Sequence, residues 1–148
     1  DKESQQKLFE SQLRLAEKYH LPVVIHSRDA TQDTMDILKK YPFVKGVIHS
    51  FSGSLEVAKI YIKMGYKLGI NGVVNFKNSH LKELLPYIKN DIILETDSPY
   101  LTPHPYRGTR SEPKYVKNIA EFISEYLNIS LEELSEITNK NILSLFDI

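Results

Sequence analysis

The sequence predicts an α/β fold with four parallel strands and helices on their outer side, as in part of a (β/α)8 TIM-type barrel. Short apolar runs alternate with segments of helical spacing, an order typical of parallel strands joined by crossover helices. An open doubly wound sheet is the alternative, but it usually has a glycine-rich first turn. Neither G-x-G-x-x-G nor G-x-x-x-x-G-K occurs in the chain. Polar residues instead follow the successive strands, which favours the face of a barrel at the carboxyl ends of its strands; they are His26, His49, Asn71 and Asp97.

The first half of the chain divides at residues that begin or end helices. Pro22 ends a run of helical spacing and precedes the first apolar strand. Ser54 can accept a hydrogen bond from the first turn of a helix, and Gly65 suits the position just past that helix. The expected elements are a helix at 5–19, a strand at 23–26, a helix at 32–41, a strand at 46–49, a helix at 55–64 and a strand at 66–70.

The second half contains one more strand and ends in helices. The apolar run 92–94 predicts a buried strand that must stop before Pro99. Pro113 fits the first turn of a helix, while Ser130 and Glu133 form a capping box for another. The expected elements are a helix at 79–88, a strand at 92–97 and helices at 113–127 and 131–146.

The composition limits the classes of protein to consider. With 148 residues and 41% hydrophobic content, we expect one compact domain spanning the whole chain. Nineteen basic and nineteen acidic side chains give a formal charge of zero, so a polyanion would need a local basic patch. There is no cysteine, no recognisable secretory leader and no apolar run near the roughly 20 residues of a membrane span. We expect a soluble, cytoplasmic protein without a membrane partner.

Histidines and carboxylates follow the predicted strands. Glu95 and Asp97 come at the end of an apolar strand, where a carboxylate must be paired, hydrogen-bonded or bound to metal. The tetrapeptide Val-Ile-His-Ser occurs twice, around His26 and His49. Because neighbouring parallel strands lie about 4.8 Å apart, we expect His26, His49 and Asp97 to converge on one rim. The alternative is that Asp97 caps a turn and Glu95 forms a surface ion pair.

The loop after Asp97 is stiffened by prolines and carries basic side chains. It contains His104, Arg107 and Arg110, and we expect it to hold them near the acidic residues. For His104, substrate contact and loop packing both remain open. His20 precedes Leu-Pro at a helix end and is expected to lie near the helix carbonyls rather than to bind a ligand.

Four ordered segments resemble the signatures of a known family: IHSRDA at 25–30, HSFSG at 49–53, LGINGVVNF at 68–76 and ETDSPYLTPHPYRG at 95–108. Together they resemble the TatD family of metal-dependent deoxyribonucleases, and the resemblance covers essentially the whole chain. It implies a (β/α)8 barrel of the metal-dependent hydrolase superfamily. Such an enzyme would hydrolyse phosphodiester bonds of DNA, often from an end, through metal-activated water.

The resemblance also implies a role for individual residues. His26 and His49 would be metal ligands, and Asp97 would bind metal and orient or deprotonate the attacking water. Glu95, the second catalytic residue, would hold a ligand or a basic side chain in place. The expected substrate-binding residues are Arg107, Arg28 and His104.

The chain departs from the family pattern in what it lacks. Family members begin with a strand carrying His-x-His and supply a metal-bridging glutamate from a Glu-x-Gly-Leu-Asp strand, and neither motif occurs here. The chain therefore resembles the carboxyl-terminal half of the barrel, strands five to eight. A complete member would hold two divalent ions, whereas we expect at most one here, and the choice among Mg, Mn and Zn stays open. Weak or absent hydrolysis is expected from these 148 residues alone.

Partners and alternative functions follow from the same pattern. The expected partners are DNA or another phosphodiester, and the missing barrel half or a second copy bound through open strand edges. A barrel hydrolase of amide or ester bonds could use the same ligands. Arg107 and Arg110 favour a phosphate-bearing substrate over that alternative. A non-catalytic remnant that binds metal or a partner is the third possibility.

Overall fold

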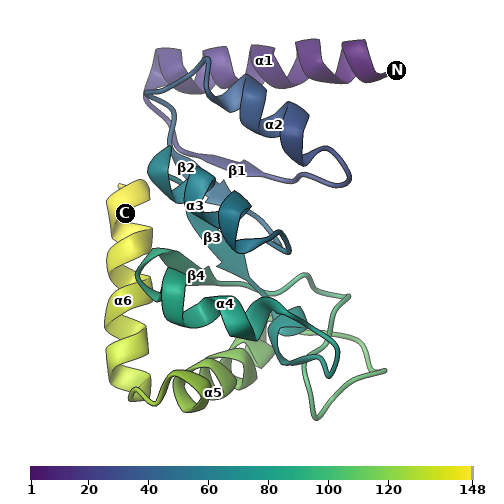
Figure 1. The fold of residues 1–148 in the computed structure, drawn as a ribbon, viewed down its shortest axis with the longest axis vertical. Helices are drawn as coiled ribbons and strands as arrows, with labels where there is room; N and C mark the ends of the chain where they lie inside the picture. The colour runs from purple at the N-terminus through teal and green to yellow at the C-terminus, as the bar shows by residue number, and fades with distance from the viewer. Residues whose placement is uncertain (148) are drawn as a thin grey trace.

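A computed structural model describes residues 1–147 and shows one parallel sheet, drawn as a ribbon in Figure 1. The strands lie in the order β1-β2-β3-β4, so neighbours in the sequence are neighbours in the sheet. Their bounds are β1 (Val23–Ile25), β2 (Gly46–Ile48), β3 (Lys67–Ile70) and β4 (Ile92–Leu94). The predicted α/β class and the parallel pairing are confirmed. Each strand ends before the polar residues expected at its carboxyl end.

Helices alternate with the strands and then close the chain. Their bounds are α1 (Lys2–Tyr19), α2 (Thr31–Leu38), α3 (Leu55–Lys63), α4 (Leu81–Ile88), α5 (Val116–Leu127) and α6 (Leu131–Leu145). Three short 3-10 turns are η1 (Gly72–Asn75), η2 (Lys89–Asp91) and η3 (Pro113–Tyr115). Among residues 1–147, no helix is long and apolar enough to cross a membrane.

The predicted caps are present, while some helix boundaries differ. The Ser54 and Ser130 hydroxyls accept hydrogen bonds from the backbone of Val57 and Glu133, as expected for N-caps. The expected helix at 32–41 ends at Leu38, because the next residues form tight turns such as the bond from the Tyr41 backbone N–H to the Leu38 carbonyl. The helix expected from Pro113 begins as the 3-10 turn η3.

The two faces of the sheet have different surroundings. The face that packs on the helices presents Ile25, Ile48 and Ile70, all buried in the core. Side chains alternate along a strand, so the intervening positions face the other way. On that second face Val24 of β1 is 63% exposed. On the same face Val47 of β2 and Ile93 of β4 are buried, and the site residues described below follow the strands on this face.

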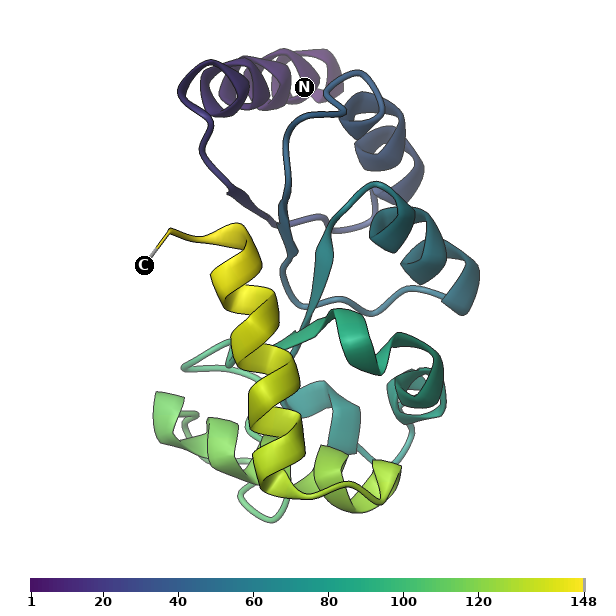
Figure 2. The same cartoon turned by 90° about the vertical axis from the view of Figure 1, so that its left-hand side faces the viewer.

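Helix α6 lies beside β4. Figure 2 shows α6 extending from α5 toward the α1–β1 connection. The buried Asn141 side chain of α6 donates from Nδ2 to the Ile92 carbonyl of β4 at 2.8 Å. We expected both outer strands to have unpaired edges, but at Ile92 this bond satisfies the outward-facing carbonyl. The carboxyl ends of the strands and the long loop after β4 lie at one edge of the sheet, on the right in Figure 1.

Candidate metal centre

His49 follows β2 directly, and both of its ring nitrogens face carboxylates. Nδ1 lies 2.9 Å from Glu95 Oε2, and Nε2 lies 3.1 Å from Asp97 Oδ1. Both separations are hydrogen-bond distances. Two of the three predicted metal ligands, His49 and Asp97, therefore meet at the expected edge, with Glu95 on the far side of the imidazole.

The sheet explains why the carboxylates reach His49. The backbone N–H of Glu95 donates to the Ile70 carbonyl at 3.1 Å, which continues the β3–β4 ladder by one residue past β4. The backbone N–H of His49 donates to the Ile25 carbonyl at 2.9 Å, which does the same for β1 and β2. Equivalent ends of parallel strands thus stay aligned, and their side chains emerge on one edge.

The imidazole of His49 is electrostatically held between two acids. Burial by itself would lower the pKa of His49, but the hydrogen bonds and charges of Glu95 and Asp97 outweigh burial and raise it. An ionised carboxylate can only accept a hydrogen bond, so both contacts are satisfied when each ring nitrogen carries a proton. A metal ion at Nε2 would have to displace one of those protons.

His26 lies next to this cluster but is not part of a complete ligand set. Its ring centroid is 5.8 Å from that of His49, and its side chain is exposed. Within residues 1–147, the structure contains no group of three or more His, Cys, Asp or Glu side chains arranged to hold a metal ion. His26 therefore lies near His49 without joining His49 and Asp97 in one group.

The spacing and chemistry of His49 Nε2 and Asp97 Oδ1 nevertheless fit two ligands of one divalent cation. Two ligands on one tetrahedral zinc, each about 2.0–2.2 Å from the metal, are roughly 3.4 Å apart. His49 Nε2 and Asp97 Oδ1 are 3.1 Å apart, and an imidazole with a carboxylate is a donor set found for zinc and manganese. Glu95 bonds the other ring nitrogen, as carboxylates commonly do behind a metal-binding histidine.

Two further residues support Glu95 and had no predicted role. The backbone N–H of Ser50 donates to Glu95 Oε1, and Ser50 has a left-handed φ of 53°. Asn71 is only 2% exposed, donates from Nδ2 to Ser50 Oγ at 2.7 Å and accepts from the Val73 backbone N–H. In the sequence Asn71 stood out only as a polar residue after a strand. Ser50 carried no signal beyond its place after His49.

The predicted substrate-binding residues divide into two groups. In the loop after β4, the Arg107 guanidinium carbon lies 3.7 Å from the centre of the Phe76 ring. The His104 backbone exchanges hydrogen bonds with the Asn75 side chain, at 3.1 Å from its N–H and 3.2 Å to its carbonyl. His104 therefore packs the loop through its main chain, while its side chain is exposed. Arg28 lies apart from them.

Arg28 belongs to the β1 side of the molecule. It lines a cavity of about 450 Å³ together with His26 and residues of α1 and α2, among them Asp33. The structure thus places Arg28 beside the one predicted ligand that stands outside the His49 cluster. Arg110, exposed in the loop after β4, lines a separate hollow with Ser98 and Glu112.

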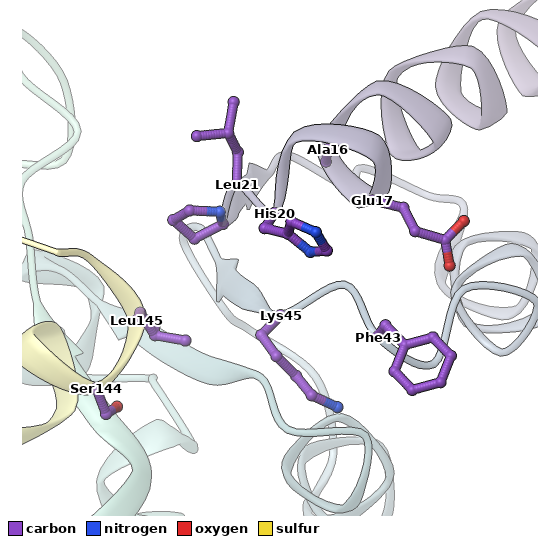
Figure 3. A pocket seen from close by; sticks show the side chains of 9 residues that line it. Ala16, Glu17, His20, Leu21, Phe43, Lys45, Ser144 and Leu145 are labelled. Atoms are coloured by element: carbon purple, nitrogen blue, oxygen red, sulfur yellow. The ribbon is translucent and has the colours of Figure 1, made fainter.

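A different cavity lies at the opposite edge of the sheet, where Pro22 and Lys45 precede β1 and β2 (Figure 3). Its volume is about 270 Å³. His20 in its wall ends α1 with a φ of 53°, and its backbone N–H bonds the carbonyls of the last turn, as predicted. The Lys45 ammonium donates to two backbone carbonyls, at 2.9 and 2.8 Å. These polar groups serve local structure, so the candidate centre remains at the carboxyl edge.

The family model of TatD related DNases matches residues 1–147. The chain is 46% identical over 151 residues to the uncharacterized metal-dependent hydrolase YabD of Bacillus subtilis. The match covers 99% of this chain and 59% of YabD. It is 34% identical over 148 residues to the uncharacterized metal-dependent hydrolase YcfH of Escherichia coli K12. This match covers 97% of the chain and 56% of YcfH.

Solved structures that resemble this chain are also TatD-related proteins. The TatD homolog YJJV of Escherichia coli K12 superposes with a TM-score of 0.91 at 29% identity, covering 99% of this chain and 57% of that one. A TatD family hydrolase from Entamoeba histolytica gives a TM-score of 0.86 at 25% identity, with the same coverage. The chain spans less than two thirds of the length of these relatives.

Proposed function

Because the chain belongs to the family of TatD related DNases, we propose that it carries part of the active site of a divalent-metal-dependent hydrolase. The observation that carries this proposal is the facing pair His49 Nε2 and Asp97 Oδ1, 3.1 Å apart at the carboxyl edge of the sheet. In barrel enzymes this edge holds the active site. That relatives are named metal-dependent hydrolases supports the same conclusion.

We further propose that β1 to β4 are strands five to eight of a (β/α)8 barrel, forming one domain with the helices over residues 1–148. Sequential strand order, parallel pairing and helices on one face of the sheet support this assignment. The barrel would be completed by segments that carry the His-x-His and bridging-glutamate motifs, whether from the same polypeptide or from a partner. The exposed Val24 beside the free edge of β1 marks where such a segment would pack.

The proposed roles concern the His49 cluster and the neighbouring His26. His49, Asp97 and His26 would hold the ion, which would be Mg, Mn or Zn. A divalent ion at such a site would supply an activated water and stabilise the leaving oxygen. Asp97, whose carboxylate lies at the open edge of the sheet, would orient the attacking water and accept its proton. Glu95 holds the His49 ring through Nδ1 and thereby aims Nε2 at the ion.

The proposed substrate is a phosphodiester, with DNA as the first candidate. Arg107 is exposed, and its guanidinium carbon lies 3.7 Å from the centre of the Phe76 ring, a contact that positions the guanidinium while its N–H groups can still bond phosphate oxygens. The same loop carries the exposed His104 side chain, and Arg28 stands beside His26. With zero formal charge, the chain favours brief engagement of a strand end over extended binding along DNA.

Metal binding by the full-length protein tests the proposal. Elemental analysis and calorimetry with Mn²⁺ and Zn²⁺ should show a bound ion, and His49→Ala, Asp97→Ala and His26→Ala should each weaken its affinity at least about tenfold. His20→Asn is the matched control, because it removes an imidazole at the opposite edge and keeps a residue that tolerates the left-handed helix end. Loss of affinity in the control alone, or in none of the variants, would refute the assigned ligands.

Cleavage of DNA by the protein tests the proposed reaction. A single-stranded DNA oligonucleotide should be shortened by the full-length protein only with a divalent ion present, and EDTA should abolish cleavage. Arg107→Gln should raise KM for DNA while leaving metal affinity unchanged, because Arg107 is assigned to phosphate and not to the ion. The 148 residues alone should show weak or absent cleavage. A protein that binds the ion but hydrolyses only carboxylic esters or amides would overturn the phosphodiester assignment.

A further inference from the structure

The Glu95 carboxylate crosses a neighbouring strand to reach His49. In the register of the sheet, Ile48 is opposite Leu68 and Gly69 is opposite Ile93, so Gly69 of β3 lies between His49 on one side and the end of β4 on the other. Glu95 comes two residues after Ile93 and therefore faces the same side of the sheet as Gly69. Its side chain passes over β3 to meet groups that follow β2.

Gly69 provides the space for that crossing. A Cβ atom built on Gly69 would lie 2.5 Å from Glu95 Oε2 and 2.6 Å from both Cδ and Oε1. No side chain larger than hydrogen is compatible with the carboxylate in this position. The backbone of Gly69 does not have the positive φ that favours glycine, so the requirement is one of space alone. Glycine inside a strand is otherwise less favourable than alanine, and it often marks a close approach.

The position of the Glu95 carboxylate is defined by hydrogen bonds to both of its oxygens. One oxygen of Glu95 bonds His49 Nδ1, and the other accepts from the Ser50 backbone N–H. Ser50 is in turn held by the buried Asn71 side chain. A displacement of the carboxylate by a methyl group would therefore break these bonds and leave the His49 ring with its contact to Asp97 alone.

We propose that Gly69 is a positioning residue, whose missing side chain leaves a passage across β3 through which Glu95 holds His49. The consequence for metal binding rests on the function proposed above. Through His49, a Gly69→Ala change should weaken metal affinity about 10- to 100-fold, as is typical when the group behind a ligand is lost. The orientation of the imidazole itself does not depend on a bound ion, and it can be measured without one.

The added methyl group should act on the side chain and not on the strand. At Gly69 the clash is with the far end of a flexible side chain, whereas a Cβ at Gly46 or Gly72 would clash with a backbone carbonyl oxygen. Gly69→Ala is thus expected to fold and to displace only Glu95. Gly53→Ala is the matched control, because the three atoms nearest to its Cβ would be side-chain carbons of Phe51 and Val57, at 3.1 to 3.2 Å.

The test is an imidazole ¹H–¹⁵N correlation spectrum of the metal-free, full-length protein. Wild type and Gly53→Ala should show the hydrogen-bonded Nδ1 proton of His49, and both Gly69→Ala and Glu95→Ala should lose it. Retention of this resonance in Gly69→Ala would overturn the proposal. Because no metal is added, this result is independent of whether the protein binds an ion as proposed.

Denaturation midpoints separate positioning from a general effect on the strand. In the Glu95→Ala background there is no carboxylate to displace, so adding Gly69→Ala should raise the midpoint, since alanine is favoured over glycine in a strand. In the presence of Glu95 the same change should lower it. If Gly69→Ala destabilises the protein equally in both backgrounds, or if both variants fail to fold, Gly69 serves the strand and not Glu95.

Discussion

The hydrogen bond between α6 and the edge of β4 can be tested by removing Asn141. Asn141 is 4% exposed, and its Nδ2 donates to the Ile92 carbonyl at 2.8 Å. In Asn141→Ala the buried carbonyl of Ile92 loses its donor, which costs about 1–3 kcal/mol of unfolding free energy. Alanine is also favoured over asparagine inside a helix by roughly 0.5 kcal/mol, which partly offsets that loss.

Asn139→Ala provides the correction for helix propensity. Asn139 lies in the interior of the same helix but is exposed, and within residues 1–147 its side chain makes one hydrogen bond, a long one of 3.3 Å to Ser135 Oγ. Its replacement should leave stability unchanged or raise it by a few tenths of a kcal/mol. The difference between the two variants isolates the bond to Ile92 and should be about 1–3 kcal/mol.

Urea denaturation and calorimetry measure this difference. For a chain of this size, 1 kcal/mol corresponds to about 2–4 °C in Tm, so Asn141→Ala should melt about 2–12 °C below Asn139→Ala. Equal melting temperatures for the two variants would refute the reasoning that α6 stabilises the β4 edge through this bond.

Three further predictions concern His49, Tyr66 and Ser54. The raised pKa of His49 means that its ion pairs stabilise the metal-free protein fully below the ordinary imidazole pKa of about 6.5, and that this contribution disappears as pH rises through the raised value. Denaturation across this range should show that loss in wild type and a smaller one in Glu95→Gln. Tyr66→Phe should leave stability unchanged or raise it by up to about 1 kcal/mol, because the buried Tyr66 hydroxyl has no hydrogen-bond partner within residues 1–147. Ser54→Ala should lower stability by about 1 kcal/mol through loss of the α3 cap, with the exposed Ser52→Ala as control.

Each of these has a clear contrary result. A pH dependence that is identical in wild type and Glu95→Gln would show that Glu95 does not raise the pKa of His49. A marked loss of stability in Tyr66→Phe would mean that the hydroxyl is hydrogen-bonded after all. If Ser52→Ala costs as much as Ser54→Ala, the bond to the Val57 backbone contributes nothing specific.

Local patterns predicted the elements well because the forces that set them are local. Helical spacing, the Ser54 and Ser130 caps and the glycine after α3 each act within a few residues, and all are present in the structure. The errors lie at the ends. The strand expected at 92–97 ends at Leu94, and one further backbone bond, from the Glu95 N–H to the Ile70 carbonyl, continues the ladder before the chain enters the loop.

The meeting of His49 with Asp97 was also predictable, for a geometric reason. Parallel strands in sequential order bring their carboxyl ends to one edge, so polar residues just past each strand must come together. What this argument cannot supply is which atoms meet. The sequence did not reveal that Glu95 faces Nδ1 and Asp97 faces Nε2, nor that His26 stands apart from the group.

The sequence by itself determined the order of strands and helices, the edge that carries the acids and histidines, and the family. The tertiary structure decided the support of the site, namely the Ser50 backbone, the buried Asn71 and the open space at Gly69. These contacts join residues more than twenty positions apart in the sequence. Whether two such atoms form a hydrogen bond or clash depends on a few tenths of an ångström in their separation. Periodicity and motif spacing describe which residues share a face, but only the packed sheet determines which of them touch.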